Sequence, residues 1–308
     1  MQFFCFLKLY VRKGIRLLAK PFLPICSLLF KYISPSVVVM IDGGICSQMG
    51  QYLLSKVFVD KGYKVEYDLS FFKYGKDMNG DHVRNFDLQR AFPYIPIKRV
   101  SQFKRFVYIK YFAHYGSFPT DDSAVWTQLK PPVILLGYYG GTEKLFDQMR
   151  KVFAVDPSVL DAENLDIYNK IPDNSVAVHV RRGDLANVKD GNYGPPVSET
   201  YFLDSITYLN NRLHSPVFYF FSDEMDYVRD AIIPKLSNNV KYQLVTNGSD
   251  KGYYDLLLIS RCSHQITSKG TLGKFGACLN PNSGIVIISK DEKQYGPLLY
   301  TNKEIIKM

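Results

Sequence analysis

Two adjacent arginines are the residues of this sequence best suited to chemistry. Arg181 and Arg182 belong to the motif His179-Val180-Arg181-Arg182-Gly183-Asp184, at the end of a strand-like run over residues 176–180. Ligands of open α/β sheets bind beyond the carboxyl ends of strands, and guanidinium groups match phosphate oxygens through paired hydrogen bonds. We therefore expect Arg181 and Arg182 to hold an anion, with Asp184 orienting an arginine or accepting a proton. The alternative interpretations are a surface turn and a chance Arg-Gly-Asp tripeptide.

A second candidate phosphate contact is the run Ser268-Lys269-Gly270-Thr271-Leu272-Gly273. It follows a short apolar run and precedes a helix that we expect over residues 274–279. Backbone N–H groups and hydroxyls at a helix N-terminus can bind phosphate, so Ser268 and Thr271 are candidate ligands. The run is not a Walker P-loop, and many turns between a strand and a helix have a similar composition.

Three further polar residues are candidate contacts for a nucleotide. Asp255 begins an apolar helix, where a carboxylate is stabilised by the helix dipole; alternatively, its two oxygens accept from the ring N–H and amino group of guanine. Ser222 and Asp223 follow an expected strand over residues 217–221 and should face the same cleft.

The N-terminal half has its own candidate ligand turn. Gly43 and Gly44 follow an expected strand over residues 37–41, and Gln48 follows within one helical turn. Glycines allow a ligand to approach the backbone, and the Gln48 amide could hydrogen-bond a sugar hydroxyl. We assign these three residues to the acceptor side, although Gly-Gly turns are common.

No pattern for a metal or a cofactor is found in the sequence. The chain has no Asp-x-Asp pair, and its five cysteines and five histidines are dispersed without a CxxC motif or a His/Cys cluster. A bound diphosphate would then be neutralised by arginines and helix N-termini, which predicts metal-independent chemistry. The odd number of scattered cysteines also predicts reduced thiols and a cytoplasmic setting.

Most of the net charge of +9 comes from the N-terminal segment. Residues 1–40 hold six basic residues and no acidic one, interleaved with Phe, Leu and Ile. No apolar stretch there is long enough to span a bilayer, so we expect residues 1–35 to be a basic amphipathic extension in peripheral contact with an anionic membrane, at its inner face. A helical arm packed on its own protein is the alternative. The low charge elsewhere argues against nucleic-acid binding.

The remaining sequence alternates between strand and helix signals. Apolar runs at residues 37–41, 64–68 and 133–136 predict strands in an N-terminal lobe over residues 36–170. Residues 171–308 repeat the pattern, with strands at 176–180, 217–221, 242–245, 264–267 and 284–289 separated by helices. Strands that alternate with helices form parallel sheets, so we predict an α/β fold with two Rossmann-like, doubly wound lobes and the donor site in the second.

These motifs, in this order, resemble those of glycosyltransferase family 11, the α-1,2-fucosyltransferases. The resemblance rests first on the Arg-Arg motif at 179–184 and extends from residue 37 to residue 289. Supporting segments are Gly43-Gly44 with Gln48, Gly137-Tyr138-Tyr139, Phe220-Phe221-Ser222-Asp223, and Asp255-Leu256 with Ser260 and Cys262. Residues 269–275 depart from the family pattern, as do Cys46-Ser47.

The resemblance implies a GT-B-like fold and an inverting transfer of fucose from GDP-fucose without a metal. Arg181 and Arg182 would then bind the diphosphate, His179 and Asp255 would contact guanine, and Thr271 would lie beside the phosphate. The expected acceptor is a galactoside hydroxyl in a surface glycan or its lipid-linked precursor. For the catalytic base, Asp184 and Asp42 are both candidates. The alternative function is a non-catalytic relative that binds nucleotides or glycans.

Overall fold

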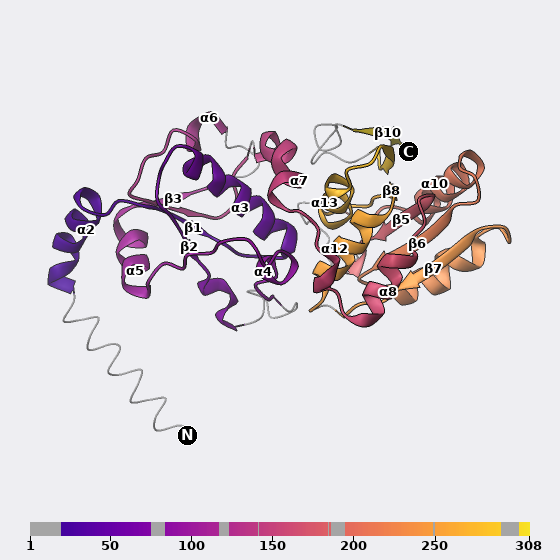
Figure 1. The fold of residues 1–308 in the computed structure, drawn as a ribbon, viewed down its shortest axis with the longest axis horizontal. Helices are drawn as coiled ribbons and strands as arrows, with labels where there is room; N and C mark the ends of the chain where they lie inside the picture. Colours follow the sequence, from indigo (N-terminus) through magenta and orange to yellow (C-terminus); the bar gives the residue numbers. More distant parts are fainter. Residues whose placement is uncertain are drawn as a thin grey trace, which may run out of the picture. The chain divides into compact units, whose positions relative to one another are not determined.

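The computed structural model divides the chain into two compact units that interleave in sequence (Figure 1). Unit 1 is Met1–Ile41, Leu54–Ser70 and Pro96–Gly141, and unit 2 is Asp42–Leu53, Phe71–Ile95 and Thr142–Met308. The structure describes residues 20–74, 84–116, 123–140, 142–183, 185, 195–248, 250–290 and 302–308.

Unit 1 is built on a four-stranded parallel sheet in the order β2-β1-β4-β3. Its strands are β1 (Val37–Met40), β2 (Val65–Asp68), β3 (Ala113–Tyr115) and β4 (Val133–Leu136). Its helices are α2 (Leu23–Tyr32), α5 (Gln102–Tyr111) and α6 (Ser123–Trp126), while α3 (Ile45–Asp60) begins in unit 2 and ends in unit 1. The buried Lys104–Glu66 ion pair joins α5 to β2.

Unit 2 contains a six-stranded parallel sheet in the order β10-β9-β8-β5-β6-β7. The strands are β5 (Ser175–Val180), β6 (Val217–Ser222), β7 (Lys241–Val245), β8 (His264–Ile266), β9 (Gly284–Ile288) and β10 (Lys303–Lys307). The helices are α4 (Leu88–Ala91), α7 (Met149–Val152), α8 (Ala162–Lys170), α10 (Glu199–Arg212), α11 (Met225–Tyr227), α12 (Gly252–Arg261) and α13 (Leu272–Leu279). The two parallel sheets confirm the predicted α/β fold with two Rossmann-like lobes.

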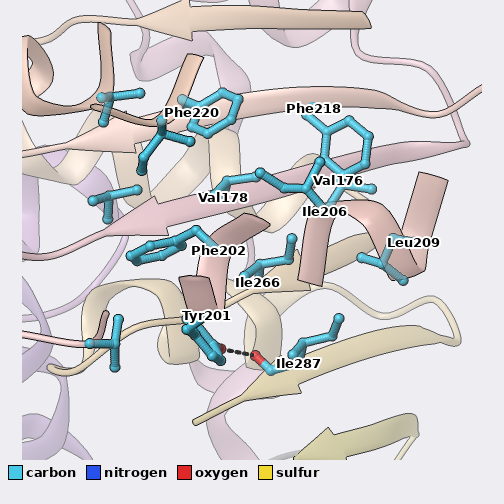
Figure 2. Close-up of a cluster of buried hydrophobic side chains, with 14 of the residues drawn as sticks. Val176, Val178, Tyr201, Phe202, Ile206, Leu209, Phe218, Phe220, Ile266 and Ile287 are labelled. Carbon is cyan, nitrogen blue, oxygen red and sulfur yellow. Dashed lines mark hydrogen bonds between the residues drawn. The ribbon is translucent and has the colours of Figure 1, made fainter. Parts of the chain in front are cut away.

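The main core of unit 2 lies between its sheet and α10. Val176 and Val178 of β5 and Phe218 and Phe220 of β6 point toward this cluster, which Figure 2 shows together with Phe202, Ile206 and Leu209 of α10. Side chains alternate between the two faces of a strand, so Ala177 and His179 lie on the other face of β5, where α13 packs.

The strand order fixes where unit 2 can bind a ligand. From β5 the chain proceeds to β6 and β7, then returns to β8 on the other side of β5 before continuing to β9 and β10. The order therefore reverses between β5 and β8. In open parallel sheets, the crevice beyond the carboxyl ends of the strands at such a reversal is the usual ligand site.

The carboxyl end of β8 is stabilised by hydrogen bonds from one tyrosine of α10. The hydroxyl of Tyr201, on α10, donates to the carbonyl oxygens of Thr267 at 2.6 Å and Ile287 at 3.2 Å, the second bond being drawn in Figure 2. Tyr201 is buried, so its hydroxyl bonds to these carbonyl oxygens instead of to water.

We predict that Tyr201→Phe lowers the free energy of unfolding by about 1–3 kcal/mol, because the Thr267 carbonyl loses this buried donor. Urea denaturation measures the effect. Tyr208→Phe is the matched control on the same helix, since the Tyr208 hydroxyl accepts from Arg212 at the exposed side. The control should change stability by less than about 0.5 kcal/mol; equal costs for both variants would contradict the bracing role.

Candidate functional site

The Arg181-Arg182 turn lies at the reversal point of the unit 2 sheet, directly after β5. The backbone N–H of Arg181 donates to the hydroxyl oxygen of Ser268 at 2.8 Å, which joins the turn after β5 to the turn after β8. Ser268 is buried. Its hydroxyl therefore fixes the backbone of the arginine turn, whereas the sequence interpretation made it a ligand contact, and that contact stays a prediction.

Asp223 holds the arginine turn in its conformation. Its Oδ1 accepts from the backbone N–H groups of Arg182 at 3.0 Å and Gly183 at 3.3 Å, and its Oδ2 lies 2.8 Å from the Arg181 guanidinium. A Cβ atom at position 183 would lie 2.8 Å from Oδ2, so a side chain there would displace the Asp223 carboxylate from this position. In this geometry Asp223 positions the arginines, and its predicted contact with a nucleotide is not tested.

Ser222 orders the segment that carries Asp223. Its hydroxyl donates to the Val180 carbonyl at 2.9 Å and accepts from the Glu224 N–H at 3.0 Å. The end of β6 is thereby tied to the end of β5, with Ser222 directly opposite Val180 in the strand register. Like that of Asp223, the predicted nucleotide contact of Ser222 stays a prediction.

Arg182 is held by two residues that the sequence interpretation missed. Its guanidinium carbon lies 4.0 Å from the centre of the Tyr227 ring, and its Nε lies 3.3 Å from a carboxylate oxygen of Glu224, beyond hydrogen-bond geometry. Stacking and charge pairing fix the plane of the guanidinium fork, while about a third of the side chain stays accessible to an anion. In the sequence, the only indication that Tyr227 and Glu224 belong to the site is their position just after β6.

The side chain of His179, near the end of β5, is buried and uncharged. Burial, and then the positive charges of Arg181 and Lys274, lower the pKa of His179 to about 3. Its Nδ1 has no hydrogen-bond partner among the described residues. A Cβ at Gly273 would lie 3.0 Å from Nδ1, so a side chain at the start of α13 would crowd the ring. His179 is thus a buried, uncharged group at the reversal point, and its contact with guanine remains a prediction.

Thr271 links the start of α13 to the start of α3. The Thr271 side chain lies close enough to the Cys46 thiol to lower its pKa, although burial outweighs this effect and raises the pKa of Cys46 to about 12. Cys46 follows the Gly43-Gly44 turn by two residues, and both segments belong to unit 2. The structure therefore brings the predicted acceptor-side glycines to the same end of unit 2 as the predicted phosphate contact Thr271.

Gln48 stabilises this region from inside. It is 0% exposed, its Nε2 donates to the carbonyls of Gly43 at 3.0 Å and Asn85 at 2.9 Å, and its Oε1 accepts from the Leu88 N–H at 2.9 Å. All of these bonds hold the glycine turn against the segment before α4. Both N–H groups of the Gln48 amide are thus occupied and the side chain is buried, and its contact with an acceptor hydroxyl stays a prediction.

Asp255 lies at the end of a chain of polar side chains in unit 2. Asn247 donates to its Oδ1 at 2.8 Å, and Asn247 and Asn164 exchange bonds at 3.0 and 3.1 Å. Asn164 in turn donates to Asp161, the N-cap of α8. Burial of the carboxyl raises the pKa of Asp255 to about 7, although the Asn247 bond acts in the opposite direction. A carboxylate held at this cost is suited to an N–H donor from a ligand.

Asp184, the predicted proton acceptor, lies outside the described residues. Asp42 is described: its Oδ1 accepts from Gln51 at 2.7 Å and its N–H donates back to Gln51 at 2.9 Å, so the carboxylate has a fixed orientation after β1. Within the described ranges, no group of three His, Cys, Asp or Glu side chains is placed to hold a metal.

Comparison with known proteins points to one family. A model of the family "Glycosyl transferase family 11" matches residues 103–298. The Escherichia coli alpha-1,2-colitosyltransferase is 28% identical over 165 residues, which cover 52% of this chain and 56% of that protein. The galactoside 2-alpha-L-fucosyltransferase SEC1 of Bos taurus is 30% identical over 120 residues, 38% of this chain and 31% of that protein. The chain thus spans about half or less of the length of these relatives.

One solved structure with a similar course of the chain is the ADP-heptose lps heptosyltransferase II of E. coli. It is 10% identical, with a TM-score of 0.48 over 88% of this chain and 90% of that one.

The raised pKa of Asp255 generates a prediction with opposite signs for stability and binding. An acid whose pKa is raised by folding binds more protons in the folded state, so its contribution to stability falls as the pH rises from about 4 to about 7. Asp255→Asn removes this penalty and keeps the oxygen that accepts from Asn247. The variant should melt above the wild type at about pH 8 and at the same temperature near pH 4.

The predicted contact between Asp255 and guanine has a consequence for the same variant: it should bind GDP about tenfold more weakly at about pH 8, because an amide N–H would face the N–H groups of the base. Calorimetry with GDP, and thermal melts across the pH range, measure the two effects. Asp250→Asn, an exposed acid just before α12, is the control and should change neither. A less stable Asp255→Asn protein with unchanged GDP affinity would show that Asp255 only caps its helix.

Proposed function

Because this chain belongs to glycosyl transferase family 11, we propose that it transfers a deoxyhexose, with fucose as the first candidate, from a GDP-sugar to a hydroxyl of a galactoside. The observation that carries the proposal is the Arg181-Arg182 turn at the reversal point of the unit 2 sheet, held by Asp223 and Ser268. The proposed acceptor belongs to a surface glycan or its lipid-linked precursor.

The proposed reaction is a direct displacement with inversion. The acceptor oxygen forms a bond to the anomeric carbon while the bond from that carbon to the β-phosphate oxygen breaks, and GDP leaves with the electron pair. Negative charge grows on the β-phosphate during this step, so guanidinium groups positioned there stabilise the transition state more than the ground state. We propose that Arg181 and Arg182 perform this task without a metal, alongside the Thr271 hydroxyl and the N-terminus of α13.

The proton of the acceptor hydroxyl passes to a carboxylate in this proposal. Asp184 and Asp42 are the two candidates, and the bonds between Asp42 and Gln51 keep the Asp42 carboxylate in one orientation. Asp255 and His179 are proposed to recognise guanine. Asp255 accepts from the base, with Asn247 fixing its carboxylate, and the neutral His179 ring adds a contact without repelling it.

Radiolabelled nucleotide sugars test this function directly. Incubation of the protein with GDP-fucose, GDP-colitose, GDP-mannose and UDP-galactose, with and without EDTA, measures donor hydrolysis and transfer to galactosides. We expect turnover of a GDP-deoxyhexose that EDTA leaves unchanged. Binding of GDP without any turnover would favour the alternative, a non-catalytic relative. Loss in EDTA that manganese or magnesium restores would contradict the metal-independent mechanism.

Arg182→Lys should lower kcat/KM about 30- to 1000-fold, which corresponds to about 2–4 kcal/mol of transition-state stabilisation. Lysine keeps the charge but lacks the planar fork that stacks on Tyr227 and grips two phosphate oxygens. Arg229→Lys is the matched control, because Arg229 lies in the same unit and pairs with the exposed Asp226. Activity of Arg182→Lys within twofold of the wild type would refute the assignment.

We also propose that α2 contacts an anionic membrane. Its inner face packs on α5, with the Phe30 ring 5.7 Å from that of Tyr108, so α2 is part of unit 1. The outer residues of α2, together with its N-cap Phe22 and its C-cap Ile33, are apolar and at least 48% exposed: Phe22, Ile25, Leu28, Leu29, Tyr32 and Ile33. The segment also carries Lys20 and Lys31 and no acid, which suits anionic headgroups. Among the described helices, none is long and apolar enough to cross a bilayer.

Vesicle co-sedimentation of the full chain tests this contact. The wild type should sediment with phosphatidylserine vesicles more than with phosphatidylcholine vesicles, and salt should weaken the binding. The double variant Leu28→Glu/Ile33→Glu should lose about 2–4 kcal/mol of membrane affinity through lost apolar burial. Val125→Glu, an exposed apolar residue of α6, is the control. Equal sedimentation of both variants would rule out α2 as the contact.

A further inference from the structure

The sheet of unit 1 has a reversal point of its own. The chain passes from β1 to β2 on one side, then to β3 and β4 on the other side, and β4 lies directly beside β1. By the same rule that places a ligand beyond β5 and β8, the carboxyl ends of β1 and β4 mark a ligand site. The residues after β4 are Gly137, Tyr138 and Tyr139, and β3 ends beside them at Tyr115.

The turns after β3 and β4 are pressed tightly together. The Gly116 N–H donates to the Leu136 carbonyl at 2.9 Å, and a Cβ at Gly116 would lie 2.0 Å from the Tyr138 carbonyl oxygen. Gly137 has φ of +79°, a conformation that side chains other than glycine rarely adopt. Two glycines are therefore needed to bring the backbones of Tyr115 and Tyr138 so close.

Three aromatic side chains, of which Trp126 and Tyr139 are buried, hold this arrangement in place. The Tyr139 hydroxyl donates to the His114 carbonyl at 2.8 Å, and its ring stacks on the His114 ring with centroids 5.7 Å apart. Trp126 donates through Nε1 to the Gly140 carbonyl at 2.9 Å. The backbone on both sides of Tyr138, and that of the neighbouring strand end, is thus pre-organised.

Two tyrosine rings on this rigid frame face solvent. Tyr115 is 66% exposed and Tyr138 is 47% exposed, whereas Tyr139 next to it is 5% exposed. An exposed tyrosine combines a flat apolar face with a hydroxyl and loses little conformational entropy on binding. Tyrosine faces carry no fixed charge, so they suit the C–H face of an uncharged sugar ring, with the hydroxyls bonding at its edge.

We propose that Tyr115 and Tyr138 form a stacking site for an uncharged pyranose ring of the acceptor glycan. The proposal rests on the proposed function, because it supplies the acceptor side of the transfer. It assigns acceptor recognition to the ends of β3 and β4 in unit 1, and it makes both tyrosines binding residues that take no part in bond breaking.

An array of uncharged and sialylated glycans, probed in the presence of GDP, tests the proposal. The wild type should bind uncharged galactosides. Tyr115→Ala and Tyr138→Ala should each weaken binding at least about tenfold, while Tyr115→Phe and Tyr138→Phe, which keep the ring face, should lose less than about threefold. Tyr242→Ala, an exposed tyrosine on β7, is the matched control and should leave glycan binding unchanged.

Donor hydrolysis and GDP affinity separate this inference from the proposed function. If both persist in Tyr115→Ala and Tyr138→Ala while glycan binding is lost, the stacking site is supported. If glycan binding is unchanged in both Ala variants, or if the wild type binds GDP but only sialylated glycans, the stacking site is refuted and the transfer function stands. If the wild type neither binds GDP nor hydrolyses a GDP-sugar, both fail together.

Discussion

Like charges on neighbouring residues repel, and Arg181 and Arg182 follow a strand in which all six residues are buried. The side chains of Arg181 and Arg182 are 30% and 32% exposed, so water screens part of this repulsion and nearby carboxylates offset the rest. At the end of β6, Asp223 pairs with the Arg181 guanidinium and also binds the backbone of the same turn, and Glu224 lies beside the guanidinium of Arg182. Each guanidinium group therefore has a carboxylate beside it within unit 2. Contacts within unit 2 thus orient both guanidinium groups.

Much of the fold could be predicted because parallel strands covered on both faces are continuous apolar runs, as in β1 and β5. The predictions missed β3 and β10, which lie at sheet edges. Edge strands are half-solvated, and Ala113-His114-Tyr115 and Lys303–Lys307 accordingly lack an apolar run. The segment after β6 is a short α-helical turn, α11, followed by a wider π-type turn over Val228–Ile232.

The sequence indicated which residues belong to the candidate site, but not the hydrogen bonds and ion pairs that they form with one another. Arg181 and Arg182 could be found because their chemistry is unusual at the end of a buried strand. The partners of Ser222, Asp223 and Ser268 could not, because they depend on the register of strands some 40 to 90 residues apart in sequence. Tyr227 and Asn247 carry no motif of their own, and their roles follow only from the contacts they make.

The interleaving of the two units has a consequence for recombination. Unit 2 takes its Gly43-Gly44 turn, the first half of α3 and all of α4 from the N-terminal half of the chain. A chimera that joins the first 141 residues of one family member to the rest of another would therefore pair a foreign Cys46 with Thr271 and a foreign Arg90 with Tyr253. Exchange of acceptor preference between relatives should succeed through short grafts at strand ends, and gene fusions at a single crossover should yield poorly assembled proteins.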